Sequence, residues 1–149
     1  SMVSLRRMTL GLLGWLLLVV FGFSAATAPG SDRQDELLAA PLELTLRMGE
    51  EKAVGQSVVR VAFGQVLEDS RCPVDAMCVW AGNAAVELGI RAGMGPTYSL
   101  KLNTNLEPRS TLWNGLRVTL LEVAPAPRAA EPTKPDAYIV RVRVETEGK

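Results

Sequence analysis

The sequence predicts an all-β protein, folded as a single antiparallel β-sandwich or small barrel of about seven strands. Apolar and polar residues alternate along several short segments after residue 41, which is the period of a strand with one buried face. Gly, Pro and Asn residues that favour turns separate these segments. No strong helical repeat interrupts the pattern, so we expect one β-domain at residues 42–149.

The first half of this domain predicts three strands. Residues 42–48 alternate Leu and Met with polar residues, and the polar segment 49–52 is expected to form a turn. Residues 57–68 form the second expected strand, with Gly64 at a bulge and an inward face made by Val59, Val61 and Phe63. The third expected strand, residues 79–91, directs three side chains inward: Val86, Leu88 and Ile90.

The second half predicts four more strands. Residues 98–102 form a strand after the turn at 93–96. Asn114-Gly115 is expected to join strands 111–113 and 116–123 in a hairpin, because this pair accepts the positive φ values of a type I′ turn. In the returning strand, the pattern places Leu116, Val118 and Leu120 on one face and Thr119, Leu121 and Val123 on the other.

A proline-rich connection precedes the last strand. Residues 125–135 contain four prolines, which excludes a central strand, and we expect this segment to cross from one sheet to the other. Residues 138–145 then form the last strand, with an inward face made by Tyr138, Val140, Val142 and Val144.

The N-terminal segment has the pattern of a secretory signal peptide at residues 1–28. Arg6 and Arg7 precede an apolar run at residues 8–23, and small residues follow, with cleavage expected after Ala26. This run is shorter than the roughly 20 residues that span a bilayer, which favours a cleaved signal over an uncleaved anchor in the inner membrane. We therefore expect a periplasmic or extracellular protein, with a linker at residues 29–41.

Composition excludes several classes of function. The chain has no His, so Ser-His-Asp and Cys-His catalytic systems and zinc sites with imidazole ligands are excluded. Lys+Arg and Asp+Glu number 16 each, and no basic cluster of the kind that binds nucleic acid is present. No nucleophile elbow, phosphate loop or metal-binding repeat appears. We expect no catalytic residues, no metal site and no cofactor; a small hydrolase that uses carboxylates is the less favoured alternative.

Cys72 and Cys78 are the only cysteines, and in an exported chain an even count predicts a disulfide. The chain-entropy model gives about 2.4 kcal/mol for a loop of roughly seven residues, so we expect the bond mainly to fix the shape of the loop. The alternative is a thiol-based metal or redox protein, since two thiolates with Met77 are soft ligands that suit Cu(I). The spacing differs from the C-x-x-C of redox pairs, which favours the structural disulfide.

The segment around the two cysteines is the most distinctive in the chain. Residues 69–82 read D-S-R-C-P-V-D-A-M-C-V-W-A-G. The pattern D-S-R-C-P-x4-C-x-W-x-G resembles that of a family of small exported bacterial proteins of uncharacterised function, and the resemblance extends over residues 57–145. Many members look like lipoproteins, whereas this chain has no Cys after its apolar run to accept a lipid. The resemblance implies no activity.

A structural and a functional interpretation of this segment both remain open. In the structural one, Trp80 covers the end of the core, Gly82 permits a tight turn, and Arg71 pairs with Asp69, with Asp75 or with backbone carbonyls. In the functional one, the loop is a binding site, because rigid loops on a β-scaffold commonly bind partners. Its candidate binding residues are Arg71, Asp75, Met77 and Trp80.

The function that these patterns favour is a non-catalytic binding module of the cell envelope. Its partner would be a protein or a small ligand, and the protein would act as a monomer. Membrane contact is expected only through an uncleaved N-terminal segment. A cation site formed by Glu68, Asp69 and Asp75 is less favoured, because these acids lack the spacing of a calcium loop.

Overall fold

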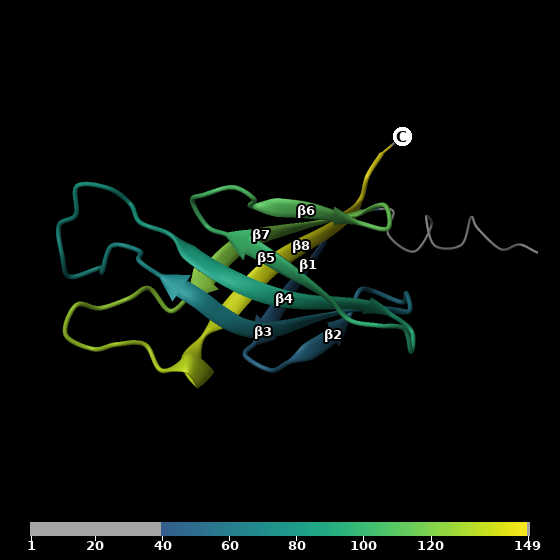
Figure 1. The fold of residues 1–149 in the computed structure, drawn as a ribbon, viewed down its shortest axis with the longest axis horizontal. Helices are drawn as coiled ribbons and strands as arrows, with labels where there is room; N and C mark the ends of the chain where they lie inside the picture. The colour runs from purple at the N-terminus through teal and green to yellow at the C-terminus, as the bar shows by residue number, and fades with distance from the viewer. Residues whose placement is uncertain (1–39, 149) are drawn as a thin grey trace, which may run out of the picture.

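The computed structural model describes residues 40–148, which form two four-stranded antiparallel sheets (Figure 1). The first sheet has the order β1-β8-β7-β6, and the second has the order β2-β3-β4-β5. The strands of the first sheet are β1 (Leu42–Arg47), β6 (Ser110–Trp113), β7 (Leu116–Ala124) and β8 (Ile139–Thr146). The strands of the second sheet are β2 (Glu51–Ala53), β3 (Val59–Asp69), β4 (Ala84–Ala92) and β5 (Tyr98–Asn103). Neither sheet closes into a barrel, so the structure confirms the predicted sandwich.

One apolar core fills the space between the two sheets. Both sheets contribute to it through the alternating residues of their strands, because successive side chains of a strand point to opposite faces. Its largest fully buried members include Leu46, Phe63, Leu88, Ile90, Leu102, Leu120 and Val142. The removal of this apolar surface from water is the main force that holds the sheets together.

The segment 49–52, predicted as a turn, overlaps the short strand β2, which begins at Glu51 and ends at Ala53. Its three residues pair with Arg60, Val61 and Ala62 of β3, and Gly49 makes the preceding turn with a φ of 78°. A strand of three residues is too short to show an alternating pattern, which is why the sequence predicted seven strands where eight form.

The third predicted strand begins too early. Residues 79–83 belong to a loop, and β4 starts at Ala84. Val79 and Trp80 are exposed, and Gly82 has a φ of 67° that a regular strand excludes. The inward face made by Val86, Leu88 and Ile90 is confirmed.

Three register shifts interrupt the pairing of the strands: two between β3 and β4, the second of them between Val66 and Glu68, and one between β7 and β8. The pairing of β3 with β4 shifts between Phe63 and Gln65, which confirms the predicted bulge at Gly64. The pairing of β7 with β8 shifts between Leu120 and Glu122. The shift in β7 turns Val123 into the core, so the prediction that Val123 and Leu120 lie on different faces of this strand is wrong.

The proline-rich connection joins β7 to β8, which are neighbours in one sheet. The predicted crossing between sheets is therefore wrong for this segment; the chain changes sheet between β1 and β2 and again between β5 and β6. A short 3-10 turn, η1 (Pro135–Ala137), ends the connection. The hairpin at Asn114 and Gly115 is confirmed, with φ values of 47° and 79°.

Three loops meet at one end of the sandwich (Figure 1). They are residues 70–83 between β3 and β4, residues 104–109 between β5 and β6, and residues 125–138 between β7 and β8. β1 begins at the other end, where Leu42 pairs with Val144.

The signal peptide predicted at residues 1–28 lies outside the described residues, as does all but the end of the predicted linker. Within residues 40–148, no helix has the length and apolar character needed to cross a membrane.

Candidate functional site

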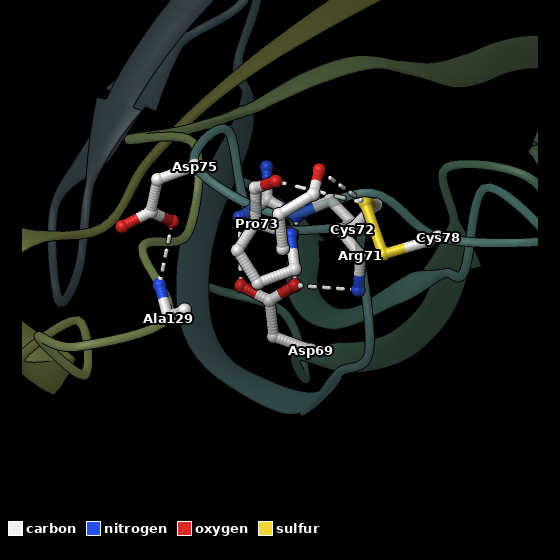
Figure 2. The surroundings of a disulfide bond; sticks show 8 residues. Asp69, Arg71, Cys72, Pro73, Asp75, Cys78 and Ala129 are labelled. Atoms are coloured by element: carbon white, nitrogen blue, oxygen red, sulfur yellow. Dashed lines mark hydrogen bonds and ion pairs between the residues drawn. A yellow bond between two sulfur atoms is a disulfide. The ribbon is translucent and has the colours of Figure 1, made fainter.

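Residues 70–83, which we call the stapled loop, contain a disulfide between Cys72 and Cys78 (Figure 2). The predicted bond is thus confirmed, and residues 40–148 contain no free cysteine. Three backbone hydrogen bonds also hold the loop: the Ser70 N–H donates to the Asn83 oxygen at 2.7 Å, the Cys72 N–H to the Ala81 oxygen at 3.2 Å, and the Ala76 N–H to the Pro73 oxygen at 3.1 Å. The backbone of the loop is therefore constrained at several points.

Arg71 joins the stapled loop to the body of the sandwich. Its Nε and Nη2 atoms donate to the two carboxylate oxygens of Asp69, each at 2.7 Å (Figure 2). Its Nη1 atom donates to the carbonyl oxygen of Val123, and Nη2 also donates to that of Pro125 at 2.9 Å. The side chain is only 14% exposed. The structural prediction for Arg71 is confirmed in its pairing with Asp69 and with backbone carbonyls.

Asp69 receives two more donors: the Arg71 N–H donates to its Oδ1 atom at 3.3 Å, and the hydroxyl of Tyr138 donates to its Oδ2 atom at 2.9 Å. Burial alone would raise the pKa of Asp69, but the hydrogen bonds from Arg71 and Tyr138 outweigh it and hold that pKa below its usual value. Burial and then the bond to Asp69 raise the pKa of Tyr138. At neutral pH the carboxylate is charged and the phenol is neutral, which makes this cluster a fixed anchor.

The tip of the stapled loop lies against the proline-rich connection. The Ala129 N–H donates to Oδ1 of Asp75 at 2.8 Å (Figure 2). The Val74 N–H donates to the Pro127 oxygen at 3.0 Å. Asp75 is an exposed residue, but one of its oxygens is already used to hold the neighbouring loop.

Asn83 organises the base of the site. It is buried, and its Nδ2 atom donates to Oδ1 of Asn103 at 2.9 Å. Its Oδ1 atom accepts the N–H groups of Asn105 at 3.1 Å and of Leu106 at 3.3 Å. Asn83 was not among the predicted site residues, because the predicted strand begins five residues too early and includes it. An Asn directly before an apolar run was the available signal.

At Gly82 the two ends of the stapled loop lie close together. A Cβ atom at this position would overlap the backbone of Ser70, and the residue has a positive φ. The predicted tight turn at Gly82 is therefore confirmed. Only glycine both adopts a positive φ without strain and has no Cβ atom to overlap Ser70.

Trp80 is 79% exposed and lies outside the core, so the prediction that it covers the end of the core is wrong. The stapled loop turns the side chain of Trp80 outward, whereas Val123 and Tyr138 belong to the core. Other exposed apolar side chains of the same end are Val74, Met77, Val79 and Leu106. Of the four predicted binding residues, Met77 and Trp80 have free side chains, whereas Arg71 and Asp75 bind other parts of the chain.

A shallow hollow of about 370 Å³ lies beside Trp80. Residues of β3, of the stapled loop and of the loop after β5 line it: Glu68, Ser70, Trp80, Ala81, Gly82, Asn83, Asn105 and Leu106. The hollow brings together an indole ring, a carboxylate and an amide from segments that are far apart in sequence.

The structure does not bring together the acids of the less favoured cation site. Asp69 binds Arg71, whereas Asp75 binds the Ala129 N–H. Within residues 40–148, no group of three or more Cys, Asp or Glu side chains is arranged to hold a metal ion. The sulfur atoms of Cys72 and Cys78 are bonded to each other, so thiol chemistry would first require reduction of this bond.

Comparisons of the chain with protein-family models, with curated proteins and with solved structures found no match. The resemblance to a family of small exported bacterial proteins stays a prediction.

Proposed function

We propose that the protein is an exported, non-catalytic binding module of the cell envelope, which contacts a protein or a small ligand through the stapled loop. The observation that carries the proposal is the combination of exposed apolar side chains with a constrained backbone. Met77 and Trp80 extend into solvent from a loop that a disulfide and hydrogen bonds hold in place. A loop that is already ordered loses little conformational entropy on binding, and exposed aromatic side chains often dominate binding energy.

The four predicted binding residues have different tasks in this proposal. Met77 and Trp80 touch the partner. Arg71 positions the loop through Asp69, Val123 and Pro125, and Asp75 positions its tip through Ala129. Replacement of Arg71 would weaken binding by releasing the loop, without any direct contact with the partner.

The proposed location is the periplasm or the extracellular space. Disulfides persist in oxidising compartments, which the Cys72–Cys78 bond supports. The apolar run at residues 8–23, preceded by Arg6 and Arg7, supports export through a signal peptide. An uncleaved segment that anchors the protein in the inner membrane is the alternative. In both arrangements the chain enters the domain at Leu42, at the end opposite the stapled loop.

Site-specific photo-cross-linking in an exporting bacterial cell tests this proposal. A photoreactive amino acid replaces Met77 in one variant and Met94 in another. Both side chains are fully exposed, but Met94 lies in the turn between β4 and β5, at the opposite end of the sandwich. We expect a discrete cross-linked product from position 77 and none from position 94.

A second substitution distinguishes cross-linking at a specific contact from cross-linking by random collision. Trp80→Ala in the position-77 variant should remove most of the cross-linked product, because it deletes the proposed anchor. The same product from both positions, or a product at 77 that Trp80→Ala leaves unchanged, would contradict the proposed contact surface.

A further inference from the structure

We propose that the hollow beside Trp80 binds the guanidinium group of an arginine side chain presented by a partner protein. This inference rests on the proposed binding function and names the chemical group that the site recognises. The hollow has a volume of about 370 Å³, which is at the small end of the range for ligand pockets. This size suits one side chain better than a larger ligand.

The floor of the hollow is fixed before any ligand arrives. The Ser70 N–H donates to the Asn83 oxygen at 2.7 Å, and Nδ2 of Asn105 donates to the Gly82 oxygen at 2.6 Å. Asn83 in turn holds the backbone of Asn105 and Leu106. A guest therefore meets a surface that is already ordered, which lowers the entropic cost of binding.

The polar groups that line the hollow leave two acceptors available. Oε1 of Glu68 accepts from the Ser70 hydroxyl at 3.1 Å, but its Oε2 atom accepts no hydrogen bond from residues 40–148. Nδ2 of Asn105 is bound to Gly82, and its Oδ1 atom also accepts none from these residues. Glu68 is the one charged residue that lines the hollow. The site thus carries a negative charge and calls for a guest that donates hydrogen bonds and is positively charged.

The indole of Trp80 selects among cationic guests. A cation above the face of a Trp ring is attracted by the quadrupole of the ring. A guanidinium group is planar, is more weakly hydrated than an ammonium group, and presents several N–H donors in a fixed geometry. It can stack on Trp80 while it donates to Glu68 and Asn105. Leu106 adds an apolar surface for the methylene groups of the arginine stem.

Titration of the full chain with short blocked peptides tests the inference. The probe is acetyl-Gly-Arg-Gly-amide, and the neutral isostere acetyl-Gly-citrulline-Gly-amide is its control. Binding is followed by the NMR signal of the Trp80 indole N–H, assigned with the Trp80→Phe variant. We expect the arginine peptide to shift this signal in a saturating way at millimolar concentrations, and the citrulline peptide to bind about tenfold more weakly or not at all.

A pair of matched variants locates the site. Glu68→Gln keeps the acceptor for Ser70 but removes the charge, and it should raise the Kd for the arginine peptide about tenfold. Glu131→Gln removes a charge from the neighbouring proline-rich connection, outside this hollow, and should leave the Kd unchanged. Circular dichroism (CD) of each variant verifies that the sandwich is intact.

The absence of a saturating shift, equal binding of the citrulline peptide, or an unchanged Kd in Glu68→Gln would each overturn the guanidinium site. These outcomes leave the proposed function standing if cross-linking still depends on position 77. Loss of that dependence removes the proposed function itself, so the two failures are distinguishable.

Discussion

Asp69, Arg71 and Tyr138 hold the stapled loop to the sandwich at the level of single side chains. Arg71 and Asp69 are two residues apart, so their pairing could be predicted from sequence. The other partners are distant: Val123 and Pro125 lie more than 50 residues from Arg71, and Tyr138 lies 69 residues from Asp69. No local pattern in one sequence reveals such contacts, because the fold alone brings these residues together.

Replacement of Tyr138 by Phe should destabilise the protein by about 1.5–3 kcal/mol, because it removes a hydrogen bond to a charged carboxylate. The free energy of unfolding from urea denaturation measures this loss. Tyr98→Phe is the matched control, since Tyr98 is half exposed and its hydroxyl makes no hydrogen bond with another described residue. Equal stability of the two variants would contradict the anchoring role of Tyr138.

The pKa of Asp69 makes the anchor sensitive to acid. The folded protein holds this pKa below the ordinary value of 3.8, so the stabilisation is complete above that value and is lost as the pH falls through the folded pKa. Urea denaturation between about pH 5 and pH 2 should therefore show a steeper loss of stability for the wild type than for Asp69→Asn. Parallel pH profiles would show that Asp69 does not carry this effect.

Gly82→Ala should destabilise the fold by about 3 kcal/mol or more, because the new methyl group would overlap Ser70 at a positive φ. Gly115→Ala is the control: it has a φ of 79° but no neighbouring atom within 4 Å, and should cost about 1–2 kcal/mol. Thermal and urea denaturation of both variants give the comparison. A smaller loss at Gly82 than at Gly115 would show that the close approach to Ser70 is unimportant.

The strands illustrate which elements a single sequence predicts. Alternation identified the long strands that make the core, including β3, β7 and β8, because a half-buried strand must alternate. It failed where alternation is absent or changes phase. The three residues of β2 are too few to show a period. The bulge after Leu120 reverses the faces of β7. Val79 and Trp80 are apolar, so the pattern placed the start of a strand at a segment that belongs to a loop.

The same limit applies to the candidate site. Cysteine spacing and the unusual motif identified the stapled loop, and Gly82 was correctly interpreted as a tight turn. The burial of Arg71 and the exposure of Trp80 could not be predicted, because both depend on which way the loop turns after β3. Asn83 was missed because the predicted strand begins too early and includes it, and because its partners Asn103, Asn105 and Leu106 lie about 20 residues away, at the end of β5 and in the loop after it.

Reduction of the Cys72–Cys78 bond should loosen the loop without unfolding the sandwich. The loop is short, so the chain-entropy model gives a loss of only about 2.4 kcal/mol, and the anchor at Arg71 remains. Urea denaturation with and without a reductant measures this difference, and far-UV CD should show unchanged strand content. Complete unfolding on reduction would contradict the view that the apolar core holds the fold.

The whole molecule separates its candidate site from the point where the chain enters the domain. Leu42 and Val144 lie at one end of the sandwich, and the stapled loop, the hollow and the proline-rich connection lie at the other (Figure 1). Under the proposed function, Met77 and Trp80 therefore lie at the end of the sandwich that is far from any attachment through the N-terminal segment. Sequence alone does not show this separation, because the separation depends on the strand order of both sheets.

We propose that the protein works outside the cytoplasm with its loop closed by a disulfide. Intact mass spectrometry of protein exported by a bacterial host, alkylated with and without prior reduction, tests it most directly. We predict a chain that starts near Thr27 and whose cysteines react only after reduction. Alkylation of both thiols without reduction would contradict the claim and would make thiol-based metal or redox chemistry at Cys72 and Cys78 the leading account.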